Sequence, residues 1–178
     1  ILSPEEILSA MADLDPLTFQ QEYEASFVTF TGRAYYPFDA TIHAKRSFQY
    51  NPALPLILCF DFNVKPGVCA FVQELSVGTV VIGEVWIPDN SNTEAVCNKI
   101  GEVWKGRHRG KIEVYGDPSG GARKTSAQQG ETDWVIVRNN LMRTFPNKVK
   151  MCVERSAPTE RSRINAVNTR LTSGDGHH

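Results

Sequence analysis

The feature that most constrains this chain is an almost continuous apolar run, LPLILCFDFN, at residues 54–63. Its length and apolar composition predict a central β-strand that is buried on both faces. A strand of this kind needs neighbouring strands and covering layers, which favours an α/β architecture around one core. The chain has 178 residues, which is long enough to build a core of that size.

The residues that follow this run predict a regular order of elements. Two β-rich segments, 67–75 and 78–87, are joined near Ser76–Gly78 and predict a hairpin that continues the first strand into a meander. Helical and strand patterns then alternate, with helices at 93–106, 132–142 and 158–171 and strands at 111–117 and 147–154. The order β-β-β-α-β-α-β-α predicts a mixed β-sheet flanked by helices.

The first 50 residues have a different character. Ser3, Pro4 and Glu6 fit the N-cap, first-turn and capping-box positions of a short helix, and a second helix is expected at 16–27. The aromatic and small residues at 31–55 indicate a boundary loop. We therefore expect a helical and loop extension over residues 1–50 and the sheet-containing domain over residues 51–178.

Composition excludes several classes of protein. No run approaches the roughly 18 apolar residues of a membrane span, and the first residues lack the pattern of a signal peptide. The four cysteines lack the spacing of a zinc site or a disulfide framework, which favours a reducing, intracellular compartment. Charge is polarised: residues 1–104 hold 5 Lys and Arg against 13 Asp and Glu, and residues 105–178 hold 14 against 7. A basic half of this kind is consistent with a polyanionic partner.

Two aspartates stand out because each follows a predicted strand. Asp61 ends the central apolar run, and Asp117 ends the strand at 111–117. Carboxylates at the ends of neighbouring central strands lie close together, and their repulsion is relieved by a shared divalent cation. Oxygen ligands suit Mg²⁺ or Mn²⁺, and two such ions can catalyse phosphodiester hydrolysis. We therefore expect Asp61 and Asp117 to be metal ligands and catalytic residues; the alternative is that each caps a turn.

Basic side chains supply candidate contacts to a nucleic-acid backbone. The loop GDPSGGARKTS after the fourth strand resembles a phosphate-binding P-loop, but Arg123 occupies a position where that motif requires glycine. Basic residues in this loop, in the connection after the 93–106 helix and on the last helix could instead reach phosphates; the alternative for each group is a solvated surface. The predicted DNA-binding residues are Arg123, Lys124, Lys105, Arg107, Arg109 and Arg163.

Three ordered motifs carry a resemblance to a known family. LCFDFNVKPG, VYGDPSGGARKTS with TDWVIVRNN, and PTERSRINAVNTRL together resemble the C-terminal nuclease domain of the large terminase subunit of tailed bacteriophages. The segment LDPLTFQQEYEASF resembles the end of the preceding ATPase motor domain, which this chain lacks. The resemblance implies a ribonuclease H-like fold and metal-dependent cleavage of concatemeric viral double-stranded DNA during genome packaging, with Asp61 and Asp117 as the matching metal-binding acids.

The resemblance also implies partners and a location. Double-stranded DNA, the portal protein and the small terminase subunit are expected partners of the full-length protein, which would act in the host cytoplasm. The family has a third metal-binding acid downstream of the last predicted helix, and Asp175 comes too early to match it. The alternatives are a non-catalytic DNA-docking module on the same fold, a nucleotide-binding domain that uses the GDPSGGARKTS loop, and a junction-resolvase-like or transposase-like nuclease.

Overall fold

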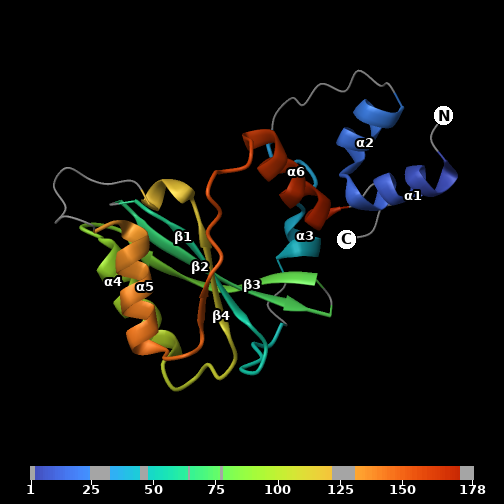
Figure 1. The fold of residues 1–178 in the computed structure, drawn as a ribbon. Coiled ribbons are helices and arrows are strands. Elements are labelled where there is room, and N and C mark those ends of the chain that lie inside the picture. The colour runs from blue at the N-terminus through green and yellow to red at the C-terminus, as the bar shows by residue number, and fades with distance from the viewer. Residues whose placement is uncertain are drawn as a thin grey trace. The chain divides into compact units, whose positions relative to one another are not determined.

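The computed structural model of the 178-residue chain describes residues 3–24, 33–44, 48–63, 65–76, 78–121 and 131–172. The chain divides into two compact units. The sheet unit is Phe48–Ala157, and the helical unit combines Ile1–Ser47 with Pro158–His178 (Figure 1). The domain boundary expected after residue 50 stays a prediction.

The sheet unit is built on five strands in the order β3-β2-β1-β4-β5. Strands β1 (Leu56–Asp61), β2 (Gly67–Leu75) and β3 (Gly78–Ile87) form the predicted antiparallel meander. Strands β4 (Ile112–Gly116) and β5 (Val149–Met151) then add to the other side of β1 in parallel. The predicted order of elements and the mixed sheet flanked by helices are therefore confirmed.

Strand β1 corrects one expectation about burial. Its alternate residues Leu56, Leu58 and Phe60 are buried, whereas Ile57 and Cys59 between them are only half-buried. The strand was expected to be buried on both faces. It is instead fully buried on one face, because the helices of this unit pack on that side (Figure 1). We call the opposite side, which carries Cys59 and Asp61, the open face.

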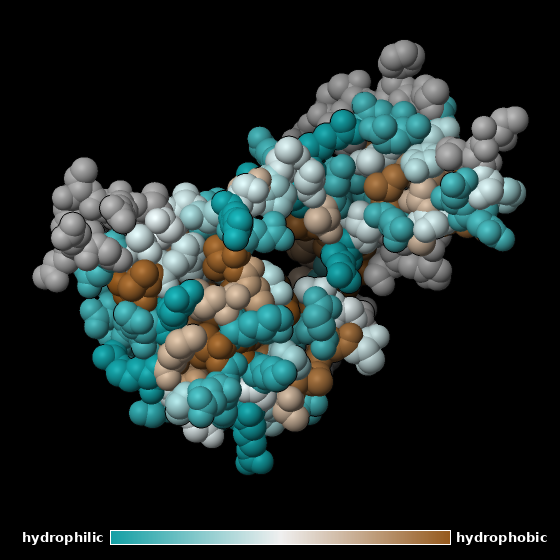
Figure 2. Space-filling view, viewed as in Figure 1, coloured by the Kyte–Doolittle hydropathy of each residue, from teal (hydrophilic) through white to brown (hydrophobic). Residues whose placement is uncertain are grey.

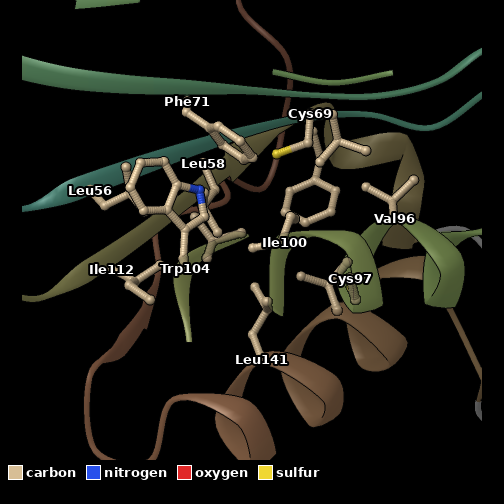
Figure 3. Close-up of a cluster of buried hydrophobic side chains, with 14 of the residues drawn as sticks. Leu56, Leu58, Cys69, Phe71, Val96, Cys97, Ile100, Trp104, Ile112 and Leu141 are labelled. Atoms are coloured by element: carbon tan, nitrogen blue, oxygen red, sulfur yellow. The ribbon is translucent and has the colours of Figure 1, made fainter. Parts of the chain in front are cut away.

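Two helices cover the buried face of the sheet. Helix α4 (Thr93–Trp104) presents Val96, Cys97, Ile100 and Trp104 to the strands, and helix α5 (Asp133–Thr144) presents Val137 and Leu141. Figure 3 shows these side chains meeting Leu58, Cys69 and Phe71 of the sheet. Because Leu58 and Ile100 are fully buried, truncating either to alanine is expected to cost about 2–5 kcal/mol.

The helical unit contains α1 (Pro4–Asp13), α2 (Pro16–Tyr23), α3 (Ala40–His43) and α6 (Glu160–Leu171). The predicted capping box of α1 is present, since Ser3 and Glu6 exchange side-chain to backbone hydrogen bonds of 2.7 and 3.2 Å. Helix α6 contacts the earlier residues of the unit. Asn168 Nδ2 donates to the Ala34 carbonyl, Arg161 pairs with Glu22, and His43 Nε2 contacts the Leu171 carbonyl.

Two elements of the helical unit differ from the prediction. The short helix α3 lies within the segment expected to be a loop; its N-cap Asp39 accepts a hydrogen bond from Thr41 N at 2.7 Å. Helix α6 begins at Glu160 rather than at Pro158, because the Thr159 side chain accepts from Ser162 N and caps it there. In the part of the chain that the structure describes, no helix has the length and apolar character of a membrane span.

Candidate functional site

The two predicted acids lie side by side at one end of the sheet. Strands β1 and β4 are parallel neighbours, and Phe60 of β1 pairs with Gly116 of β4. Asp61 directly follows Phe60, and Asp117 directly follows Gly116. Neighbouring strands are about 4.7–4.9 Å apart, so the register places the backbone of these two residues on adjacent strand ends, about one strand spacing apart. Both side chains are exposed. We call this the carboxyl end of the sheet, and the end at which β1 and β4 begin the amino end.

Each aspartate also stabilises the turn that follows it. Asp61 Oδ2 accepts a hydrogen bond of 2.8 Å from the Asn63 side-chain amide, and Asp117 Oδ1 accepts one of 2.7 Å from Ser119 N. The turn-capping alternative is thus realised at both positions. Capping does not bury either carboxylate, so a role in the turn is compatible with binding a ligand from solvent.

The loop after β4 is fitted against an aromatic cluster. A Cβ at Gly120 would lie 2.3 Å from Phe62 Cε2 and 2.9 Å from Trp134 Nε1, and a Cβ at Gly116 would lie 2.6 Å from the Phe60 carbonyl oxygen. The Phe62 and Trp134 rings meet edge to face at 4.6 Å between centroids. Glycine is therefore required at both positions by close approach, which explains these two glycines of GDPSGG without a phosphate-binding role.

Trp134 has a role that the sequence did not reveal. Its helical position predicted a core residue, and it does pack against the core. In addition, its indole Nε1 donates a 3.0 Å hydrogen bond to the Asp117 carbonyl oxygen, and so helps fix the backbone that carries this acid. The signal that could have indicated this is general: a buried or half-buried indole N–H needs an acceptor.

A cavity of about 300 Å³ opens at the carboxyl end. It is bordered by the N-termini of α4 and α5, whose N-caps Asn92 and Thr132 accept from Ala95 N and Val135 N. The two helix starts are linked through Thr93 Oγ1, which donates to Asp133 Oδ1 at 2.6 Å. The cavity is lined by Phe60, Asp61, Phe62, Asn63, Val68, Ser91, Asn92, Thr93, Glu94, Val96, Glu131, Thr132, Asp133 and Ile136.

Three of the predicted basic residues lie at the opposite end of the sheet unit. Lys105, Arg107 and Arg109 follow the C-terminus of α4 at the amino end, where Arg109 N donates to the Pro52 carbonyl just before β1. The length of β4 puts about 16 Å between them and the aspartates. Arg163 is exposed on α6 in the helical unit. Arg123 and Lys124 lie outside the described residues, so their DNA-binding role stays a prediction, as it does for the others.

Glu84, an exposed acid on strand β3, lies apart from the two aspartates. It lies on β3 opposite Ala70, so strand β2 separates it from β1. Within the described ranges, no group of three or more His, Cys, Asp or Glu side chains is arranged to hold a metal. Asp61 and Asp117 stay the predicted donor set for a cation. This set fits Mg²⁺, which proteins hold through one or two carboxylates together with substrate phosphates and water.

Comparison with known proteins identifies the fold. No protein-family model and no curated protein matches the chain. Among solved structures, the large terminase of the thermophilic bacteriophage D6E matches with a TM-score of 0.58 at 13% identity, covering 96% of this chain and 39% of that one. The same terminase in complex with ATP-gamma-S matches with a TM-score of 0.60 at 14% identity, covering 96% and 41%.

These matches agree with the element order and the sheet described above. The chain spans about 40% of the length of the terminase chains that it matches. At this level of identity the likeness concerns the fold. The predicted fold class is confirmed: the chain has a ribonuclease H-like fold of the kind found in phage large terminase structures.

Proposed function

We propose that this chain is the nuclease part of a large terminase, a metal-dependent endonuclease that cuts concatemeric viral double-stranded DNA during genome packaging. The observation that carries the proposal is the pairing of Asp61 and Asp117, which end adjacent parallel strands at the carboxyl end of the sheet. In open α/β sheets this is the end at which ligands bind. The likeness to the D6E terminase supports the same conclusion.

The chemistry expected of this end follows from its charges. When bound, Mg²⁺ or Mn²⁺ ions activate a water molecule and stabilise the leaving oxygen of a phosphodiester. Asp61 and Asp117 would hold these ions, and the exposure of both side chains gives a DNA backbone access to them. The N-termini of α4 and α5 open at the same end, where their dipoles favour the negative charge of carboxylates and phosphates.

The wider role is part of the same proposal. Double-stranded DNA is the proposed substrate, and the portal protein and small terminase subunit are the proposed partners of the full-length protein in the host cytoplasm. Lys105, Arg107, Arg109 and Arg163 are proposed contacts to the DNA backbone. Because Lys105, Arg107 and Arg109 lie at the amino end, they could contact only DNA that extends well beyond the carboxylates.

The test is a plasmid-nicking assay in Mn²⁺. Asp61→Asn and Asp117→Asn each remove a ligand charge, and we expect each to lower the cleavage rate more than 100-fold, because metal coordination supplies several kcal/mol at the transition state. Glu102→Gln is the control: Glu102 is exposed on α4 and paired with Lys99, and its loss should leave the rate unchanged. Full activity in either aspartate variant would refute the proposed site.

One observation favours a second candidate, a DNA-docking module without catalysis. Among the described residues, no third His, Cys, Asp or Glu joins the two aspartates in a metal-binding group. A docking module predicts DNA binding that weakens with salt, survives Asp61→Asn and is accompanied by no cleavage at any Mn²⁺ concentration. Nicking by the unaltered chain that disappears in Asp117→Asn would exclude it.

A further inference from the structure

The open face of the sheet carries exposed aromatic side chains near the aspartates. Trp86 on β3 is 58% exposed, and Tyr115 on β4 is 40% exposed. Besides these aromatic side chains, the visible surface of the sheet unit carries hydrophobic residues among hydrophilic ones (Figure 2). Large aromatic side chains dominate binding energies when they are buried, so an indole left this open indicates a surface that a ligand can cover.

The strand register places Trp86 in line with the aspartates. Asp61 pairs with Val68 on β2, and Val68 pairs with Trp86 on β3. Directly paired residues on antiparallel strands point to the same face of a sheet, so Asp61, Val68 and Trp86 form one row. Two strand spacings separate Trp86 from Asp61, roughly 9.5 Å.

We propose that Trp86 is a stacking site for an unpaired base of the DNA strand held at Asp61 and Asp117. This inference rests on the proposed nuclease function and adds a contact that positions the substrate. Bases within a duplex already stack on one another, so an aromatic side chain on a sheet surface binds a base that has left the stack. Trp86 therefore favours DNA that is single-stranded or locally open beside the carboxylates.

The charges around Trp86 show which part of the DNA it contacts. Strand β3 contains no Lys or Arg, and Glu84 lies two residues away on the same face. A carboxylate repels phosphate, so the contact is to a base rather than to the backbone. Its contribution to binding should therefore be nearly independent of salt, unlike phosphate contacts, which weaken steeply as salt rises.

Two measurements test the proposal in EDTA, where cleavage is absent and binding is read by itself. The first is acrylamide quenching of tryptophan fluorescence with and without a single-stranded oligonucleotide. Trp104 is 4% exposed and Trp134 is half-buried, so Trp86 provides most of the accessible signal. We expect the oligonucleotide to protect this signal and expect no protection in Trp86→Phe, which lacks the reporter. Unprotected Trp86 at saturating oligonucleotide would overturn the proposal.

The second measurement is the affinity for labelled single-stranded and fully paired DNA at several salt concentrations. Trp86→Ala should weaken single-strand binding at least about fivefold at every salt concentration, and duplex binding less than twofold. Trp86→Phe should retain part of the affinity. Val81→Ala is the matched control, because Val81 is 67% exposed on the same strand and takes no part in the row. An equal loss in Val81→Ala, or an equal loss for duplex DNA, would overturn the proposal.

This design separates the inference from the proposed function. If Asp61→Asn and Asp117→Asn fail to change cleavage while Trp86→Ala still weakens single-strand binding selectively, the assignment of the two carboxylates fails and the stacking site survives as a DNA contact. If the aspartate variants lose cleavage and Trp86→Ala binds normally, the stacking proposal alone is refuted. Thermal unfolding of both Trp86 variants checks that each is folded.

Discussion

The two ends of the sheet unit are built from different kinds of side chain. At the carboxyl end, Asp61 and Asp117 are exposed, and Asp61 lines a cavity of about 300 Å³. At the amino end, His108 is 2% exposed and satisfied on both ring nitrogens: Nε2 contacts the Lys111 carbonyl at 3.0 Å and Nδ1 contacts the Tyr50 hydroxyl at 2.7 Å. The carboxyl end thus offers polar groups to solvent, whereas the amino end uses them internally.

The direction of the helices explains this difference. Helices α4 and α5 begin at the carboxyl end, so their C-termini lie at the amino end. A helix C-terminus favours positive charge, and Lys105, Arg107 and Arg109 directly follow that of α4. Lys105, which is the C-cap residue of α4, therefore has a stabilising role in the fold whether or not it contacts DNA, whereas Arg107 and Arg109 lie beyond the last turn, where this effect falls off. The comparison teaches that both ends use charge in the fold, through the helix C-terminus at the amino end and the turns after Asp61 and Asp117 at the carboxyl end, where the two acids nevertheless stay exposed.

Apart from the two aspartate variants, the largest effect is expected from Gly120→Ala at the carboxyl end. The added Cβ would lie 2.3 Å from Phe62 Cε2 and 2.9 Å from Trp134 Nε1, the donor to the Asp117 carbonyl. Overpacking of this kind costs about 1–3 kcal/mol of stability. Displacing Trp134 should also shift Asp117 and lower cleavage more than about tenfold, since small misplacements of catalytic groups are costly. Denaturant unfolding and plasmid nicking measure the two effects.

Gly121→Ala is the matched control for this change. A Cβ at Gly121 would be 3.8 Å from Trp134 Cδ1, which is an ordinary contact, so stability and cleavage should both stay close to those of the unaltered protein. Equal losses in the two variants would show that the close approach at Gly120 does not hold Asp117 in place.

A smaller effect is expected at the amino end from His108→Phe. The change leaves the Lys111 carbonyl and Tyr50 hydroxyl without their partner and should cost about 1–3 kcal/mol of stability. Cleavage per folded molecule should be unchanged, because the ring lies at the other end of the sheet. If His108→Phe were as stable as the unaltered protein but no longer cut DNA, the amino end would have a role in cleavage and the comparison between the two ends would be wrong.

The same histidine predicts a pH dependence of stability. Burial lowers the pKa of His108, and the nearby Lys148 ammonium lowers it further. The unfolded chain therefore binds a proton at a higher pH than the folded protein does, with an unfolded pKa of about 6.5. This contribution to stability is present above that pH and is lost as the pH falls through 6.5 towards the lower folded pKa. Unfolding between pH 8 and 5.5 should show a steeper loss than in His108→Phe.

Local signals in the sequence predicted much of the fold. The Ser3–Glu6 capping box, the Asn92 cap of α4 and the apolar run of β1 each depend on neighbouring residues, and the structure confirms all three. Helix α3 was missed because it has only four residues and its last residue, His43, is held by the distant Leu171 carbonyl. Features that depend on contacts between distant residues leave no local pattern to read.

The candidate site was predictable to the same extent. The placement of Asp61 beside Asp117 follows from their positions after two strands, and the register of β1 and β4 bears out that geometry. The sequence did not show at which end of the sheet Lys105, Arg107 and Arg109 lie, because a count of charges along the chain gives no position in space. Topology could have corrected this, since a helix that returns from the carboxyl end delivers the next residues to the amino end. Trp86 was missed because exposure on one sheet face depends on which side the helices pack.

The smallest effect, and the sharpest test of the comparison, concerns Arg107. Its guanidinium lies over the rings of Trp104 and Tyr50, at 4.9 and 5.4 Å from their centroids. Arg107→Ala should therefore cost about 0.5–1 kcal/mol of stability, measured by denaturant unfolding. Arg109→Ala is the matched control, because Arg109 is exposed in the same connection and its loss should change stability by less than about 0.5 kcal/mol.

The salt dependence of DNA binding in the same two variants decides whether the amino end is also a DNA contact. If both arginines bind phosphates, each substitution should lower the slope of log affinity against log salt by about one. The two variants would then have the same salt slope but different stabilities. Both arginines would contact phosphate, whereas only Arg107 stacks on Trp104. Unchanged slopes in both variants would instead show that Arg107 and Arg109 do not contact DNA and that any role they have is structural. DNA would then be recognised by the carboxyl end and the open face.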